Sequence, residues 1–210
     1  MKDTGLVALT EFLRHPSMVG SAFPATARMV RHVLASIDWA QISVAIEFGP
    51  GSGRFTFAML ERMRPDATLL ALETGAAFVE KLRVANRDPR LIVVKDSAIE
   101  VHRHLAAHEL ARPDLVLSGL PFSSLDECEA EAIMGVTAAT LNSSGLFAAY
   151  QMRSTIRGLI YRHFAVVRHA YEWRNIPPCH LYWARKPGAR ENRGAHARSH
   201  SVDEGSGLET

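Results

Sequence analysis

The sequence is poor in cysteine and has no long apolar run. Only two of its 210 residues are cysteines, Cys128 and Cys179, and they form no Cys-x-x-Cys pair. We therefore expect reduced thiols rather than a disulfide framework. No apolar stretch approaches the roughly 20 residues of a membrane span, and the first residues lack the basic segment and apolar core of a secretory signal. These absences indicate a cytoplasmic globular protein.

Metal and nucleoside-triphosphate motifs are missing as well. The ten histidines include His102, His104 and His108, but no His-Glu-x-x-His motif, so we expect solvated helix residues and no metal site. No Gly-Lys-Ser/Thr ending follows the glycine-rich segment, which excludes a triphosphate loop.

The length and the 47% hydrophobic content indicate one main domain with a sizeable core.

A net charge of +2 conceals a basic second half. From Arg153 to Arg198, the sequence contains ten lysine and arginine residues but only two acidic residues. This excess predicts an anionic partner, either a lipid surface or nucleic acid. In the alternative interpretation, many of these arginines are simply solvated or paired.

The central feature of the sequence is a predicted strand, a glycine-rich turn and a helix within residues 43–63. Residues 43–48 are typical of a buried parallel strand, and apolar residues recur at helical spacing from 54 to 63. Between them, Gly49, Gly51 and Gly53 give a G-x-G-x-G spacing, which differs from the G-x-G-x-x-G of dinucleotide binders. These glycines either serve only to form a tight turn or also let the backbone approach a bound ligand closely.

Two acidic residues favour the ligand-binding interpretation. Glu47 lies two residues before the first glycine, where it can pair with a ligand ammonium. Glu73 follows the next predicted strand, where such folds hydrogen-bond a ribose diol. An amino acid joined to a ribose indicates S-adenosylmethionine rather than NAD.

Strand and helix patterns alternate along the chain, which predicts a doubly wound parallel sheet. In such sheets ligands bind at the carboxyl ends of the strands, where Glu73, Asp96 and Ser118 are expected. The last two strands are expected to pair antiparallel. Strands are predicted at 43–48, 68–72, 91–94, 115–117, 146–152, 164–171 and 180–184, and helices at 25–37, 54–63, 76–84, 99–110 and 127–141, with a basic amphipathic segment at 153–164.

Residues 47–53 resemble motif I of the class I S-adenosylmethionine-dependent methyltransferases, and Glu73 resembles their motif II acid. Segments 13–24, 117–122 and 174–178 resemble the bacterial phospholipid N-methyltransferases, relatives of the ribosomal RNA adenine dimethyltransferases. The resemblance covers roughly residues 10–187. It implies a Rossmann-like α/β fold with a mostly parallel seven-stranded sheet, helices on both faces and an antiparallel last strand.

We expect three parts in the chain. Residues 1–40 would form amphipathic helices that either contact a membrane or pack on the domain. Residues 41–187 would form the catalytic domain that binds S-adenosylmethionine, and residues 188–210 a disordered tail. The cofactor-binding residues implied by position and resemblance are Ser21, Glu47, Phe48, Gly49, Gly51, Gly53, Glu73, Thr74, Asp96, Ser97 and Ser118.

Within that set, Asp96 has two compatible interpretations. The resemblance implies that it accepts the amino hydrogen of adenine. Alternatively, Asp96 and Ser97 only begin the following helix as an N-cap.

Residues 118–122, with the sequence Ser-Gly-Leu-Pro-Phe, lie where amino methyltransferases place motif IV. Adenine dimethyltransferases have Asn/Asp-Pro-Pro-aromatic or Asn-Leu-Pro-aromatic there, and the amide and backbone carbonyls orient the target amine. Ser118 is interpreted as the replacement for the amide, as in the phospholipid enzymes. Positioning supplies most of the catalysis of such a transfer. The expected catalytic residues are Ser118, Gly119, Leu120, Pro121 and Tyr150, the last with a core position as its alternative.

The first functional hypothesis is methylation of phosphatidylethanolamine and its methylated intermediates towards phosphatidylcholine, at the inner face of the membrane. The second is N6-methylation of RNA adenine, which the missing motif IV amide disfavours without excluding nucleic acid. The third is a non-enzymatic cofactor-binding module, which the two acids oppose. Another aminolipid, such as ornithine lipid, or a soluble amine stays open as acceptor.

Overall fold

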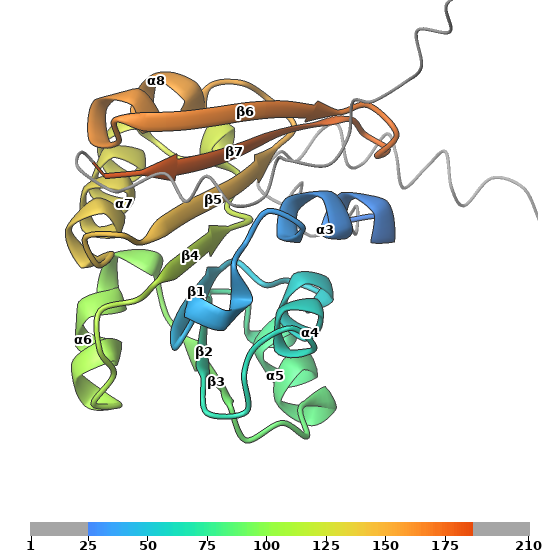
Figure 1. Cartoon of the computed structure of the whole chain (residues 1–210), viewed down its shortest axis with the longest axis vertical. Coiled ribbons are helices and arrows are strands. Elements are labelled where there is room, and N and C mark those ends of the chain that lie inside the picture. Colours follow the sequence, from blue (N-terminus) through green and yellow to red (C-terminus); the bar gives the residue numbers. More distant parts are fainter. Residues whose placement is uncertain (1–24, 187–210) are drawn as a thin grey trace, which may run out of the picture.

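Seven strands form one sheet in the order β3-β2-β1-β4-β5-β7-β6 (Figure 1). The computed structural model describes residues 25–186. Strands β1 to β5 are parallel, whereas β7 runs antiparallel to both of its neighbours. The predicted sheet is thereby confirmed. Its strands are β1 Val44–Phe48, β2 Thr68–Glu73, β3 Leu91–Lys95, β4 Leu115–Ser118, β5 Leu146–Gln151, β6 Val166–Glu172 and β7 Cys179–Arg185.

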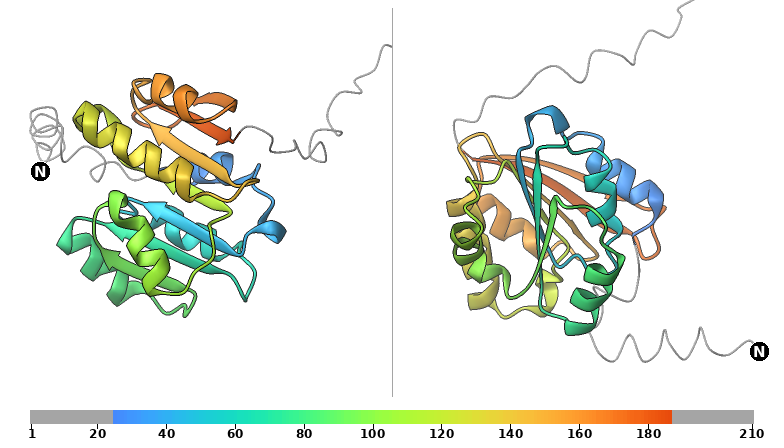
Figure 2. Two further views of the ribbon diagram at one scale, coloured as in Figure 1. Left: turned by 90° about the vertical axis from the view of Figure 1, so that its left-hand side faces the viewer. Right: turned by 90° about the horizontal axis from the view of Figure 1, so that it is seen from below.

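Helices cover both faces of this sheet, as the two views of Figure 2 show. Helices α3, α4 and α5 lie on one face, and α6, α7 and α8 on the other (Figure 1). The helices are α3 Ala27–Leu34, α4 Arg54–Leu60, α5 Ala76–Ala85, α6 Val101–Ala107, α7 Glu127–Thr140 and α8 Ile156–His163, with short 3₁₀ turns η2 Trp39–Gln41, η3 Ala98–Glu100 and η4 Phe122–Ser124.

Each buried strand divides its side chains between the two cores. In β1, Ala45 joins the core beneath α3 and α4, whereas Ile46 and Phe48 join the core beneath α6, α7 and α8. Because successive side chains of a strand point to opposite faces, Glu47 lies on the α3/α4 face with Ala45. This parity decides which side chains can meet at the site.

Helix α3 packs into the same core as the strands. Its side chains Met29 and Val33 are buried, and Trp183 of β7 donates its ring N–H to the Val33 carbonyl at 3.0 Å. Thr26 is the N-cap residue of the helix, and its hydroxyl accepts the Met29 amide. The division of the chain at residue 40 stays a prediction. Residues 1–24 of the expected N-terminal amphipathic helices, which include Ser21, and the expected tail 188–210 lie outside the described residues.

Most helices are shorter than the sequence patterns predict. The helices expected over 25–37 and 54–63 span only Ala27–Leu34 and Arg54–Leu60. The helix expected to reach residue 110 ends at Ala107, because Glu109 adopts φ +54°. The Leu110 amide then donates to the Leu105 carbonyl. This hydrogen bond caps the C-terminus of the right-handed helix, with Glu109 as the left-handed residue that follows it. The segment expected from residue 153 becomes helical only at Ile156.

Candidate functional site

The glycine-rich turn joins β1 to α4 and bends sharply. Gly49, Gly51 and Gly53 have φ of +67°, +52° and +80°, a region that residues with a Cβ adopt only with strain. A Cβ on Gly53 would overlap side chains of α4 and α5, whereas one on Gly51 would meet no atom within 4 Å. The backbone at Gly51 therefore borders open space at the carboxyl edge of the sheet.

Glu73, the last residue of β2, ties two loops together. One of its carboxylate oxygens accepts the Gly51 amide at 3.0 Å, and the other accepts the Gly75 amide at 2.8 Å. The residue is 9% exposed. Because each carboxylate oxygen has a second lone pair, Glu73 can brace the glycine-rich turn and still accept hydrogen bonds from a ligand.

Glu47 is buried beside that turn, with one carboxylate oxygen unpaired. Oε2 accepts the Thr56 hydroxyl at 2.6 Å, while Oε1 has no hydrogen-bond partner among residues 25–186. Burial raises the pKa of Glu47 to about 8, opposed by the Thr56 hydrogen bond and assisted by the charge of Glu73. An unpaired buried carboxyl with a raised pKa is typical of a functional site.

Asp96 directly follows β3, and its carboxylate contacts side chains of the next helix, α6. Oδ1 accepts the Ser97 amide at 2.9 Å, and Oδ2 contacts His104 Nε2 at 2.8 Å and the Arg103 guanidinium. These contacts, His104 first, lower the pKa of Asp96. Ser97 caps η3 by accepting the Ile99 amide at 3.3 Å, so the capping geometry is present at Ser97.

The segment after β4 brings Gly119 against Tyr150. A Cβ on Gly119 would overlap the Tyr150 hydroxyl and lie 3.1 Å from the Gly49 carbonyl oxygen. Gly119 donates its amide to the Phe48 carbonyl at 2.9 Å, and the Tyr150 ring stacks on Phe55 with centroids 4.5 Å apart. The glycine-rich turn, the motif IV segment and Tyr150 therefore meet at one place.

Ser118 does not share that place. It is fully buried and in register with Phe48 and Ala149, on the sheet face away from Glu47 and Tyr150. Its hydroxyl accepts the Leu120 amide at 3.4 Å and so supports the turn. When Leu-Pro-Phe is aligned with the Leu-Pro-aromatic motif, Gly119, and not Ser118 as expected, takes the position of the amide residue.

The Leu120 carbonyl is already occupied by two protein donors, the side-chain amide of Gln151 at 2.7 Å and the backbone amide of Phe122. Pro121 begins the 3₁₀ turn η4. Thr74 is exposed directly after Glu73, and Phe48 is wholly buried, so that only its backbone borders the turn.

Sequence reasoning missed Thr56 and Gln151. Thr56 is a buried polar residue on the apolar side of α4, three residues after Gly53, and its hydroxyl binds Glu47. A polar residue at an apolar position of this helix is the sequence signal that could have identified it. Gln151 ends a strand that is otherwise apolar or aromatic, a position from which an amide reaches a neighbouring loop.

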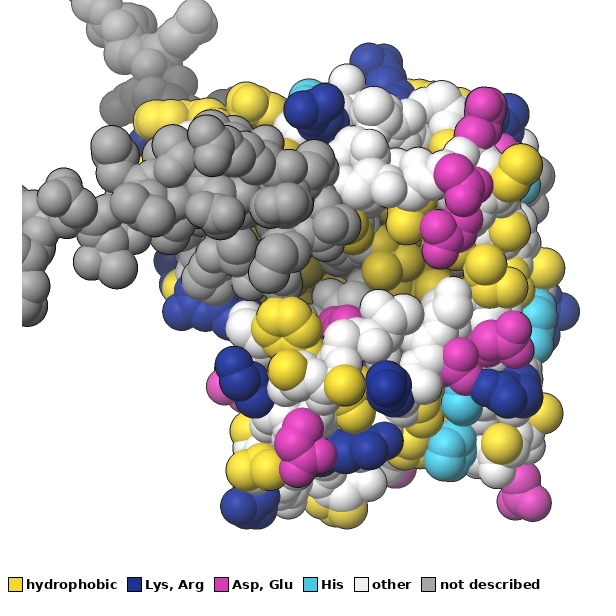
Figure 3. All heavy atoms as spheres, turned by 180° about the vertical axis from the view of Figure 1, so that it is seen from behind, with side chains coloured by type: hydrophobic (Ala, Val, Ile, Leu, Met, Phe, Trp, Pro, Cys, Tyr) yellow, Lys and Arg dark blue, Asp and Glu magenta, His cyan; other side chains and the backbone are white. Residues whose placement is uncertain are grey.

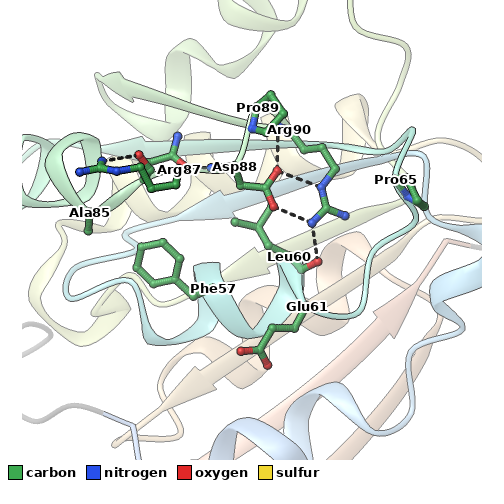
Figure 4. Close-up of a pocket in the computed structure, with 10 residues that line it drawn as sticks. Phe57, Leu60, Glu61, Pro65, Ala85, Arg87, Asp88, Pro89 and Arg90 are labelled. Atoms are coloured by element: carbon green, nitrogen blue, oxygen red, sulfur yellow. Dashed lines mark hydrogen bonds and ion pairs between the residues drawn. The ribbon is translucent and has the colours of Figure 1, made fainter.

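A separate hollow lies at the opposite edge of the sheet, between the end of α4 and the loop before β3 (Figure 4). Arg90 crosses it, donating to Asp88 at 2.6 Å and to the Leu60 carbonyl at 2.8 Å. These bonds tie the loop to the helix. In the described part of the chain, no three histidine, cysteine or acidic side chains gather closely enough to hold a metal ion.

No protein-family model matches the chain. Among curated proteins, it is 29% identical over 195 residues to the ornithine lipid N-methyltransferase of Singulisphaera acidiphila, which spans 91% of this chain and 100% of that protein. It is 30% identical over 117 residues to ribosomal RNA small subunit methyltransferase A of Nocardia farcinica, spanning 53% of this chain and 38% of that protein.

Solved methyltransferase structures share the fold at low identity. Precorrin-6y C5,15-methyltransferase from Geobacter metallireducens superposes with a TM-score of 0.61 at 16% identity, over 78% of this chain and 94% of that one. N-methyltransferase NodS from Bradyrhizobium japonicum, in complex with S-adenosyl-L-homocysteine, gives 0.58 at 13% identity, over 76% and 84%. These likenesses show that the chain has the fold of the class I S-adenosylmethionine-dependent methyltransferases, and the curated relative that matches along its full length supports its assignment to that family.

Proposed function

We propose that the chain transfers a methyl group from S-adenosylmethionine to the amine of a membrane aminolipid. The observation that carries this proposal is the meeting of Tyr150, Gly119 and the glycine-rich turn, which leaves a tyrosine hydroxyl where motif IV of the adenine enzymes has an amide. The full-length relative named as an ornithine lipid N-methyltransferase supports an aminolipid acceptor. Ornithine lipid and phosphatidylethanolamine both present a primary amine, and the experiment below distinguishes them.

The two buried acids are proposed to hold the cofactor. The ribose diol would donate to Glu73, whose oxygens already accept the Gly51 and Gly75 amides and retain lone pairs. The cofactor ammonium would pair with the free Oε1 of Glu47 and draw that carboxyl into its ionised form. Asp96 would accept the adenine amino hydrogen, in exchange for part of its contact with Arg103. Thr74 and Ser97 border this region, and Ser21 keeps its expected cofactor role as a prediction.

Tyr150 is proposed to orient the acceptor amine. Burial, with the nearby charge of Glu47, raises the pKa of Tyr150, so the phenol stays protonated and its oxygen can accept an amine N–H. The neutral nitrogen then directs its lone pair at the cofactor methyl carbon. A nitrogen–carbon bond forms, the carbon–sulfur bond breaks with its electron pair going to sulfur, and the methylated ammonium later loses a proton to solvent. Alignment of the two reactants supplies most of the rate.

RNA adenine is the second candidate acceptor, favoured by the partial match to the ribosomal RNA enzyme. Several observations favour the lipid. Gly119 supplies no side-chain amide to an adenine, and the match spans 38% of the RNA enzyme. On the face seen in Figure 3, lysine and arginine side chains are interspersed with acids, and Arg162, from the basic half, is paired with Glu131.

The test uses the purified full chain with S-adenosylmethionine labelled on its methyl group. Three acceptors are offered separately: ornithine lipid in detergent micelles, phosphatidylethanolamine in the same micelles, and unmodified small-subunit ribosomal RNA. Label in one lipid supports the proposal and names the head group. Label in RNA alone, or in no acceptor while the cofactor still binds, overturns it. Glu73→Gln, in which weaker cofactor binding is expected, is the low-activity control at a subsaturating concentration of S-adenosylmethionine, and Glu80→Gln is matched to it as an exposed acid on α5.

A further inference from the structure

The turn between β6 and β7 presents two large apolar side chains to solvent. Trp173 is 65% exposed and Ile176 is 79% exposed. The Arg174 guanidinium lies 4.7 Å from the centre of the Trp173 ring. Exposed aromatic and aliphatic side chains beside a cation are an unusual combination for a hairpin tip that contacts only water.

Buried polar contacts hold this tip in place. Asn175 is 2% exposed, accepts the Thr26 amide at 3.0 Å and donates to the Pro177 carbonyl at 2.8 Å. Glu172 is 3% exposed, and it accepts the Arg174 amide at 3.1 Å and pairs with His32 at 3.0 Å. Because Glu172 and Asn175 point inward, the intervening and following side chains are held outward. Their exposure is therefore built into the fold.

The tip lies at the same edge of the sheet as the candidate site. Tyr150 is in register with Leu181, and the last residue of β5, Gln151, with His180, so the turn extends past the carboxyl end of β5. It projects beside α3 in Figure 1. Arg28 on that helix lies 3.5 Å from the buried Glu172 carboxylate and keeps 53% of its side chain exposed, and Arg153, two residues after the end of β5, is exposed too. Cations thus flank the apolar tip.

We propose that the 173–178 tip inserts into the headgroup region of a lipid bilayer and holds the mouth of the methyl-transfer site against the membrane, an inference that rests on the proposed aminolipid substrate. Tryptophan rings favour the membrane–water interface, where an apolar body and a polar N–H are both accommodated. Ile176 gains by leaving water, and the flanking arginines bind lipid phosphates. A bilayer fits this combination of features, and the substrate is already part of that surface.

The test compares the full chain with the double variant Trp173→Ala/Ile176→Ser in sedimentation with vesicles of phosphatidylethanolamine and phosphatidylglycerol. We expect a loss of vesicle binding of about tenfold or more, from the apolar area withheld from the bilayer. Methylation of the lipid acceptor in vesicles should fall in parallel, while methylation in detergent micelles and cofactor affinity stay unchanged. Val84→Ser is the matched control, because Val84 is 61% exposed at the far end of α5.

A second readout uses vesicles whose acyl chains carry bromine, which quenches nearby tryptophan. Quenching is expected in the parent chain and should fall sharply in Trp173→Phe, because Trp183 is 5% exposed and Trp39 lies in η2, before β1 and therefore at the opposite, amino edge of the sheet. Unaltered vesicle binding in the double variant, or no quenching, overturns the inference. If micellar lipid is methylated while vesicles are not bound, the membrane tip is wrong and the proposed function stands. If vesicle binding depends on the tip but no lipid is methylated, the proposed function fails by itself.

Discussion

The Tyr150 hydroxyl occupies the position at which a side chain on Gly119 would begin. The absence of a Cβ at position 119 and the presence of a phenol at position 150 are therefore parts of one arrangement. Gly119 is needed because Tyr150 reaches into its space, and Tyr150 can reach the site because Gly119 leaves it open.

The first prediction follows from this relationship. Tyr150→Phe should lower kcat for the lipid acceptor by about 10- to 100-fold, because one hydrogen bond that orients the amine is lost. Cofactor affinity should stay the same, because no cofactor contact is assigned to the hydroxyl. Steady-state kinetics with micellar lipid measure the first effect and calorimetry the second. Tyr161→Phe, an exposed tyrosine on α8, is the control, and an unchanged kcat would remove Tyr150 from the mechanism.

The second prediction concerns the protonation of Glu47. With a pKa of about 8 in the free protein, this carboxyl holds a proton at pH 7. Pairing with the cofactor ammonium should ionise it, so binding releases close to one proton. Calorimetry in buffers of different ionisation enthalpy measures that number. Glu47→Gln should retain only the release due to the ligand itself, and equal release in both proteins would contradict the pairing.

The raised pKa of Glu47 should also make the free energy of unfolding depend on pH. In the unfolded chain Glu47 has its ordinary pKa of 4.5, so between pH 4.5 and about 8 the folded state alone holds the proton. The free energy of unfolding contributed by Glu47 is therefore greatest below pH 4.5 and falls as pH rises towards 8. Denaturant titrations of the parent chain and Glu47→Gln should show a slope difference of that sign.

The third prediction tests Glu73. Glu73→Gln removes the charge and leaves one of the Gly51 and Gly75 amides without its acceptor. Affinity for S-adenosylmethionine should fall by about 10- to 100-fold, the usual cost of losing charge-assisted hydrogen bonds. Far-UV circular dichroism should remain that of the parent chain. Glu80→Gln should bind the cofactor normally; if Glu73→Gln also does, the ribose assignment is wrong.

The fourth prediction concerns stability alone. Glu109 holds φ +54° at the end of α6, a conformation that costs a residue with a Cβ about 1–2 kcal/mol. Glu109→Gly should therefore raise the free energy of unfolding by about 0.5–1 kcal/mol after the entropy cost of glycine. Ala107→Gly, in the right-handed last turn of the same helix, should lower it by a similar amount. Denaturation curves of the three proteins decide the point.

The sheet was predictable because buried parallel strands are continuous apolar runs with acids or glycines after them. The strand expected at 68–72 is β2 Thr68–Glu73, and the strand expected at 91–94 is β3 Leu91–Lys95. The end of α6 was not predictable, because Glu109 carries no sequence signal for a left-handed conformation. Helix ends of this kind are usually marked by glycine.

The site was only partly predictable. Residues that directly follow a strand, such as Glu73 and Asp96, could be placed at the carboxyl edge without knowing any side-chain direction. The pairing of Gly119 with Tyr150 depends on the register of β4 with β5, and the burial of Ser118 depends on which face that residue takes. The bond between Thr26 and Asn175 joins residues 149 apart in sequence, which no local pattern encodes.

The position of β7 also governs the order in which the protein can assemble during synthesis. This strand comes last in the sheet's sequence order, yet it lies between β5 and β6 and pairs with both. Strands β1 to β4 can associate as they leave the ribosome, whereas β6 has no partner in the sheet until Arg185 has been made. The half that carries the glycine-rich turn can therefore form early, while the part of the sheet beside Tyr150 and the exposed hairpin tip are completed only after β7 has been made.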